Sequence, residues 1–196
     1  MHSDPLQLTW KDYKITLAQE SPDLPRYNPR SADNVVGPEE HELFLGDRSY
    51  RPASRHRVSI SHAEIPVACC VLFADGGASG VHNHSALVHG DALVVAVGAF
   101  MCALQLPELV LCWHTRADTA TCFGVYDAPS WGSLISHGEL QIARVNYSGQ
   151  VVWSTSGRDI FSEGFTLFEK HAEAIDFNGT KYRIELETGN IEIIAA

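Results

Sequence analysis

A repeat with a period of 40 residues constrains the fold of this chain more than any other feature of the sequence. The stretches Ala92–Trp113 and Gly132–Trp153 share one order: an apolar run, a central glycine, a second apolar run, a turn and a tryptophan. A third copy follows after another 40 residues, where Gly189 takes the place of Gly149. A unit of this size cannot bury both faces of its strands alone, so neighbouring units must pack together.

Turn residues between short apolar runs predict where the strands of each unit meet. The pairs Ser148-Gly149, Asn178-Gly179 and Thr188-Gly189 each separate two apolar runs, so each should join adjacent antiparallel strands. Asn178-Gly179 is typical of a type I′ turn, whose two central residues both need a positive φ. Upstream, Phe100 to Leu106 alternates in polarity and ends at Pro107, which predicts a further strand.

The ending Gly149-Gln150-Val151-Val152-Trp153 resembles the turn and strand of blades in quinoprotein-type β-propellers, and the resemblance extends over residues 90–196. It implies antiparallel blades, but no residue matches a quinoprotein cofactor site, so no cofactor is carried over. Three clear copies are fewer than the four or more blades of a closed propeller. We therefore predict an all-β fold of repeated antiparallel hairpins, arranged either as propeller-like blades or as a sandwich.

Residues 1–196 are predicted to form a single domain with two unlike parts. Residues 1–52 form a proline-rich, irregular N-terminal segment, and residues 53–196 form the β core with the repeats. The first part contains most of the prolines, namely Pro5, Pro22, Pro25, Pro29, Pro38 and Pro52.

Three local predictions concern the secondary structure outside the repeats. The alternation of Tyr13, Ile15 and Leu17 predicts one strand in the N-terminal segment, followed by an irregular loop over 21–34. Pro38-Glu39-Glu40 is expected to open a short helix that runs to Leu45 and ends at Gly46. His171 to Ala174 is the one further stretch in which a helical turn is expected.

Composition limits the partners and the compartment of the chain. A formal net charge of −10 argues against nucleic acid and suits a protein partner, in particular a basic one. No apolar run approaches the roughly 20 residues of a membrane span, and the N-terminus lacks a signal-peptide pattern. The five cysteines form no C-x-x-C pair, which favours reduced thiols. These features predict a cytoplasmic protein that binds no membrane.

The histidines after Gly76 form the sharpest local motif. On a strand, His82 and His84 would project from one face, as two ligands of one metal must, and His89 could supply a third imidazole. The spacing resembles the first motif of cupins, although His89 stands where that family has an acid. The alternative interpretation is a glycine-rich loop whose histidines are solvated or hydrogen-bonded.

Other residues carry weaker signals of a site. The pairs His62-x-Glu64 and His137-x-Glu139 could orient an imidazole with a carboxylate, but surface cross-links look the same in sequence. Trp113 and Trp153 occupy equivalent repeat positions and are expected to anchor the core. Trp131 lies in a Pro-Ser-Trp-Gly loop and could contribute to a binding surface.

The sequence contains no nucleophile elbow, no phosphate-binding loop, no dinucleotide fingerprint and no H-E-x-x-H. Without such a motif, the repeat scaffold favours a non-enzymatic binding or interaction module with no catalytic residues and no cofactor. The alternative is a metal-binding protein or metal-dependent enzyme that holds a divalent metal through His82, His84 and His89.

Overall fold

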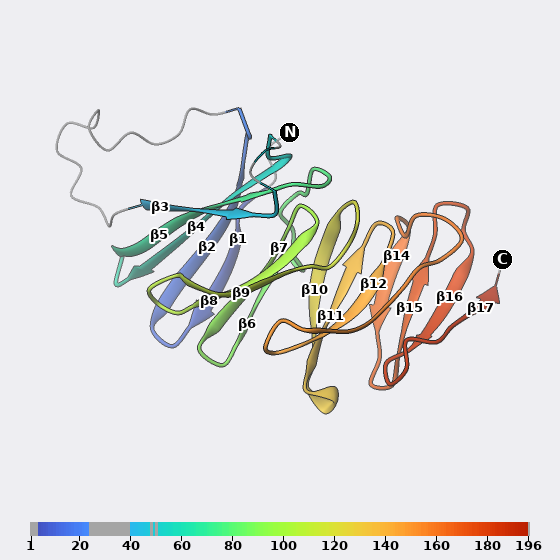
Figure 1. Cartoon of the computed structure of the whole chain (residues 1–196). Coiled ribbons are helices and arrows are strands. Elements are labelled where there is room, and N and C mark those ends of the chain that lie inside the picture. The colour runs from blue at the N-terminus through green and yellow to red at the C-terminus, as the bar shows by residue number, and fades with distance from the viewer. Residues whose placement is uncertain (1–3, 24–39, 48, 50, 196) are drawn as a thin grey trace.

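The computed structural model describes residues 4–23, 40–47, 49 and 51–195, which form four β-sheets and one short 3-10 turn. Figure 1 shows the sheets in a row that follows the order of the chain, with the first and last sheets at opposite ends. The row does not close into a ring. The prediction of an all-β fold of repeated hairpins is confirmed, and its arrangement is that of successive propeller-like blades.

Sheet A, the N-terminal sheet, has five strands. Their order across the sheet is β1 (Leu6–Trp10), β2 (Tyr13–Glu20), β4 (Ser54–His62), β5 (Ile65–Ala74) and β3 (Glu40–Leu45). All neighbours are antiparallel except β3, which pairs in parallel with β5.

The other three sheets are antiparallel meanders in which the strands follow one another in chain order. Sheet B contains β6 (Ala86–His89), β7 (Ala92–Val97), β8 (Phe100–Gln105) and β9 (Val110–Arg116). Sheet C contains β10 (Cys122–Ala128), β11 (Ser133–Gly138), β12 (Ile142–Asn146) and β13 (Val151–Thr155). Sheet D contains β14 (Gly164–Leu167), β15 (His171–Ile175), β16 (Lys181–Glu185) and β17 (Ile191–Ala195). The 3-10 turn η1 (Pro129–Trp131) joins β10 to β11.

Three hydrophobic cores fill the spaces between successive sheets. Strand β7 shows how one strand serves two of them: Leu93 and Val95 pack into the core shared with sheet A, whereas Val94 and Ala96 pack into the core shared with sheet C. The third core lies between sheets C and D. The central strands are therefore apolar on both faces, which explains their continuous hydrophobic runs.

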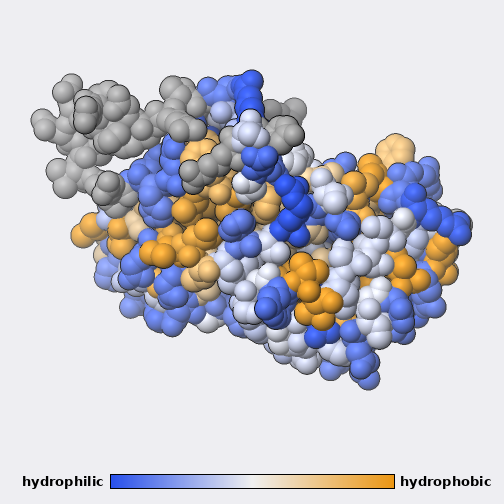
Figure 2. All heavy atoms as spheres, viewed as in Figure 1, coloured by the Kyte–Doolittle hydropathy of each residue, from blue (hydrophilic) through white to orange (hydrophobic). Residues whose placement is uncertain are grey.

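The outer face of sheet D is polar. A charged row crosses it, in which Arg183 lies between Glu173 and Glu192 on neighbouring strands. Such a face does not need a further sheet to cover it. On the side of the molecule viewed in Figure 2, hydrophobic side chains form separate groups among hydrophilic ones.

All four tryptophans of the sequence are described, and each ties its own sheet to the next one. Every indole N–H donates to a main-chain carbonyl of the following sheet: Trp10 to Gly90, Trp113 to Tyr147, Trp131 to Glu169 and Trp153 to Leu186. Trp113 and Trp153 occupy equivalent places, as the repeat predicts, although both remain partly exposed.

The crossover from each sheet to the next is tied to the middle hairpin turn of that next sheet. The three equivalent main-chain hydrogen bonds run from Ala99 to Asp75, from Glu139 to Thr121 and from Phe177 to Ile160. In the second crossover, the buried carboxylate of Asp118 also accepts hydrogen bonds from the N–H groups of Ala120, Leu140 and Gln141. The spacing between sheets is thus fixed by polar contacts as well as by the cores.

Two helical predictions were wrong. Glu40–Leu45 forms strand β3, because pairing with β5 lets Leu43 and Leu45 reach the core between sheets A and B. Pro38 and Glu39, which were expected to open that helix, lie outside the described residues, as does most of the predicted loop over 21–34. His171–Ile175 forms strand β15, because Ala172 and Ala174 are buried on one face of sheet D.

The predicted hairpin turns join adjacent antiparallel strands at all three places. The turn type at Asn178-Gly179 differs from the prediction: Gly179 has a φ of 84°, but Asn178 is not among the residues with positive φ. The side chain of Asp176 accepts hydrogen bonds from the N–H groups of Asn178 and Thr180, which stabilises a different turn with one left-handed residue.

The strand predicted around Tyr13, Ile15 and Leu17 is confirmed as β2. Among the described residues, no helix is long and apolar enough to cross a membrane.

Candidate functional site

The clearest hollows among the described residues lie where turns of sheets C and D meet. In Figure 1 the 3-10 turn η1 projects beyond the neighbouring turns at the lower edge, with the β14–β15 turn close to it. Both turns belong to the end of the sheets where each strand pair reverses within a few residues. Trp131, the last residue of η1, separates two adjoining hollows.

We call these two hollows together the Trp131 groove. The smaller hollow has a volume of about 210 Å³ and is lined by Asp127, Ala128, Pro129, Ser130, Trp131, Leu167, Phe168 and Glu169. The larger hollow has a volume of about 310 Å³ and is lined by Trp131, Lys170, His171, Arg183, Glu185 and Glu187.

Trp131 is held firmly in this groove. Its indole N–H donates to the carbonyl of Glu169 at 2.8 Å, and the guanidinium of Arg144 lies 5.2 Å from the ring centroid. Arg144 in turn donates to the carbonyl of Leu186 at 2.9 Å and to the hydroxyl of Ser133 at 3.1 Å. The side chain is half-buried rather than fully exposed, so it offers a fixed aromatic edge to the groove.

Asp127 is the best-ordered carboxylate of the groove. Its Oδ1 accepts a hydrogen bond from the Tyr147 hydroxyl at 2.7 Å, and its Oδ2 lies 3.6 Å from Nδ1 of His89. The rings of His89 and Tyr147 stack at 3.7 Å. Burial and the hydrogen bond to Asp127 raise the pKa of Tyr147 to about 12, so its hydroxyl stays a donor at neutral pH.

Acidic groups outnumber basic ones in the groove. The carboxylates of Asp127, Glu169, Glu185 and Glu187 line it, together with the ammonium of Lys170 and the guanidinium of Arg183. Arg183 is already paired with Glu173 at 3.5 Å and Glu192 at 3.8 Å. The smaller hollow is lined by two carboxylates and by no basic side chain.

The three histidines expected to bind a metal lie in different surroundings. Nε2 of His82 is 2.8 Å from the carbonyl of Phe123, and its Nδ1 accepts the N–H of His84 at 3.2 Å. His84 stacks on Tyr126 at 4.4 Å, whereas His89 stacks on Tyr147. Within the described parts of the chain no three His, Cys, Asp or Glu side chains converge as metal ligands. Metal binding by these residues stays a prediction, and it would require His82 to give up its present contacts.

His82 and His84 instead belong to a connected group of six rings with Phe123, Tyr126, His137 and Phe165. Tyr126 packs against Phe165 at 4.7 Å, His137 stacks on Phe165 at 4.8 Å, and Phe123 meets His137 edge to face at 5.5 Å. Burial lowers the pKa of His137 to about 4, although its hydrogen bond to the Phe161 carbonyl opposes that shift. This imidazole is therefore neutral at physiological pH.

The two predicted histidine–carboxylate pairs are not paired in this way. His137 makes its hydrogen bond with the carbonyl of Phe161. His62 is exposed at the end of β4 and packs against Tyr13, with ring centroids 5.1 Å apart.

A buried serine–histidine network lies beneath the glycine-rich loop. Ser79 Oγ donates to Ser54 Oγ at 3.0 Å and accepts the N–H of Gly98 at 2.8 Å, while His56 Nε2 is 3.1 Å from the Ser79 carbonyl. Burial lowers the pKa of His56 to about 4. All three side chains are buried, so this network anchors the loop and offers no accessible nucleophile.

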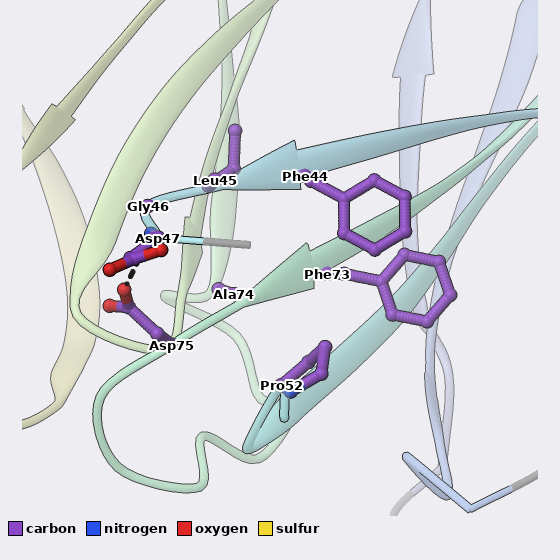
Figure 3. Close-up of a pocket in the computed structure, with 8 residues that line it drawn as sticks. All are labelled: Phe44, Leu45, Gly46, Asp47, Pro52, Phe73, Ala74 and Asp75. Carbon is purple, nitrogen blue, oxygen red and sulfur yellow. Dashed lines mark hydrogen bonds between the residues drawn. The ribbon is translucent and has the colours of Figure 1, made fainter. Parts of the chain in front are cut away.

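A third hollow lies at the ends of β3 and β5. Figure 3 shows Phe44 and Phe73 side by side, and the carboxylate of Asp75 accepting the N–H of Asp47 at 2.9 Å. Its volume of about 10 Å³ has room for no more than a water molecule. We interpret it as a structural junction.

Sequence reasoning found Trp131 but missed the residues that complete its groove. Asp127 to Gly132 reads as a turn in the sequence, and nothing in it indicates that Glu169 and Phe168, some 40 residues away, lie beside it. The 40-residue period itself is the signal that could have paired the two turns.

Comparisons with known proteins agree with this description of the fold. No protein-family model matches the sequence, and a search of curated proteins finds no match. Among solved structures, the chain is similar to the crystal structure of BamB from Moraxella catarrhalis, a β-propeller, with 12% identity and a TM-score of 0.52. The match covers 98% of this chain and 63% of that one, so the chain spans less than two thirds of its structural neighbour. This chain therefore has a propeller-like fold of repeated blades.

Proposed function

We propose that this chain is a binding module that recognises a partner protein through the Trp131 groove. One observation carries the proposal: two adjoining hollows, of about 210 and 310 Å³, meet at a fixed tryptophan on turns held by well-packed sheets. Turns on a rigid scaffold are a common place for recognition. The propeller-like fold supports this interpretation as a scaffold but does not define the partner.

The groove has the composition of an interaction site. Phe168 is a large apolar side chain with 43% of its surface exposed, and it stacks on His171 at 4.6 Å. Aromatic residues with a polar surround are enriched at protein interfaces. Because η1 and the β14–β15 turn come from adjacent sheets, a partner that fills the groove would contact both sheets at once.

Site-specific crosslinking tests the proposal. A photo-crosslinking amino acid at Ser130, which lines the smaller hollow, should trap a defined partner in the cells that express the chain. The matched control places the same group at Phe177, which is 64% exposed and lies at the opposite end of strand β15. The change Phe168→Ser should reduce crosslinking from Ser130 at least several-fold. Equal crosslinking from both positions, or none from Ser130, would show that the groove is not the binding face.

A further inference from the structure

We propose that the smaller hollow of the Trp131 groove is a receptor for one cationic side chain, a lysine or an arginine, carried by an extended segment of the partner protein. This inference rests on the proposed function and names the chemistry of the partner. Size gives the first argument, because about 210 Å³ is below the roughly 300–1,000 Å³ of pockets that take drug-sized ligands. A hollow of this size suits a single long side chain.

Charge gives the second argument. The carboxylates of Asp127 and Glu169 line this hollow, and no basic side chain lines it. Opposite charges brought together at a partly desolvated site form charge-assisted hydrogen bonds, which are stronger than neutral ones. The net charge of −10 for the whole chain adds a long-range attraction for a basic segment.

The aromatic lining gives the third argument. Trp131 and Phe168 contribute rings to the same hollow as the two carboxylates. An ammonium or guanidinium is attracted to the face of an aromatic ring, and its methylene stem packs against apolar surface. The structure already contains one such contact, since the Arg144 guanidinium lies over the Trp131 ring.

Preorganisation gives the fourth argument. The hydrogen bond from Tyr147 and the nearby ring of His89 fix the carboxylate of Asp127 before any partner arrives. A fixed carboxylate loses little conformational freedom when it binds a cation. The change Tyr147→Phe should therefore weaken binding although Tyr147 does not line the hollow.

Two positive charges lie near the hollow and oppose this preference. The guanidinium of Arg144 is partly neutralised by the carbonyl of Leu186, which accepts one of its hydrogen bonds. Lys170 belongs to the larger hollow, where Glu185 and Glu187 accompany it. The smaller hollow therefore remains the place where carboxylates predominate.

Nuclear magnetic resonance of the full chain provides the test. The probe is the blocked tripeptide Ac-Gly-Lys-Gly-NH2, compared with the same peptide carrying Nε-acetyl-lysine, and an arginine peptide compared with its citrulline form. The indole N–H of Trp131 reports on the groove, and those of Trp10, Trp113 and Trp153 are internal controls. We expect the charged peptides to shift the Trp131 signal saturably and the neutral peptides to bind at least tenfold more weakly.

Matched variants make the test decisive. Asp127→Asn with Glu169→Gln keeps the shape of the hollow and removes its charge, and should weaken the charged peptides at least tenfold. Glu163→Gln removes an exposed carboxylate in the C-to-D crossover and should change nothing. Equal binding of charged and neutral peptides, unchanged binding by the double variant, or no shift at Trp131 would overturn the inference.

The outcome also separates this inference from the proposed function. A partner crosslinked from Ser130 with the same yield in the double variant would support the groove as the binding face and overturn the cationic receptor. Loss of that crosslink in the double variant, with Glu163→Gln unaffected, supports both.

Discussion

The ring of Trp113 lies against the α-carbon of Gly149 in the next sheet, so closely that a β-carbon added at Gly149 would sit 2.6 Å from the ring. Trp153 and Gly189 repeat this relationship one sheet later, at 2.8 Å. The spacing of tryptophan and glycine seen in the sequence is therefore a packing rule between sheets: the turn of each sheet must be bare where the tryptophan of the preceding sheet lands.

This rule predicts unequal effects for two similar glycine changes. Gly149→Ala should lower the free energy of unfolding by about 2–5 kcal/mol, because it combines a left-handed backbone with a clash against the ring. Gly179→Ala is the matched control: its φ of 84° is close to the 86° of Gly149, but an added β-carbon there meets nothing within 4 Å. The control should lose only about 1–2 kcal/mol. Equal losses in urea denaturation would show that the tryptophan contact contributes nothing.

The carboxylate of Asp118 should be a strong determinant of stability. It accepts three main-chain N–H groups, two of them from the hairpin turn of the next sheet. Asp118→Ala leaves those donors without their acceptor and should lower the free energy of unfolding by about 2–4 kcal/mol. Asp159→Ala, at the equivalent crossover, is expected to lose about 1 kcal/mol, because Asp159 is less buried and holds a side-chain amide and one N–H. A smaller loss for Asp118→Ala than for Asp159→Ala in denaturant melts would contradict this ranking.

The fold could be predicted from the sequence where one local signal and the packing agreed. The repeat, the alternating runs and the Gly149, Gly179 and Gly189 turns located three of the four sheets. Sheet A was harder, because β3 reaches its place by pairing in parallel with β5 across a long connection. Helix propensity around Glu40 gave the wrong answer there, since tertiary pairing overrode a local preference.

The candidate site was harder to predict than the fold because its residues come together only through the stacking of sheets. His82, His84 and His89 are close in sequence, yet the turn after His84 directs His89 along β6 toward Tyr147. Asp127 and Glu169, far apart in sequence, meet beside Trp131. Sequence spacing describes one strand well, but a site between two sheets depends on the register between them.

We expect no stoichiometric metal at His82, His84 and His89, because the contacts that position these rings oppose a shared site. Elemental analysis of protein purified without an affinity tag measures this directly. Added zinc should leave the melting temperature unchanged, since a ligand that does not bind the native state cannot stabilise it. One equivalent of metal that is lost in His84→Ala would instead establish the metal-binding alternative.

The stability of the chain should fall as the pH decreases from about 6.5 toward 4. Burial lowers the pKa of His56 and of His137 from 6.5 to about 4, so the unfolded chain binds protons more readily than the folded one across this range. Their contribution is fully present above pH 6.5 and is lost progressively below it. For His56, which is fully buried, the loss at pH 4.5 should reach about 2–3 kcal/mol. Denaturant unfolding at pH 7.5, 6.5, 5.5 and 4.5 measures the slope. His56→Gln should be less stable than the wild type at pH 7.5 but should show a shallower decline with acid. A slope that is unchanged in His56→Gln would mean that protonation of this imidazole does not govern acid stability.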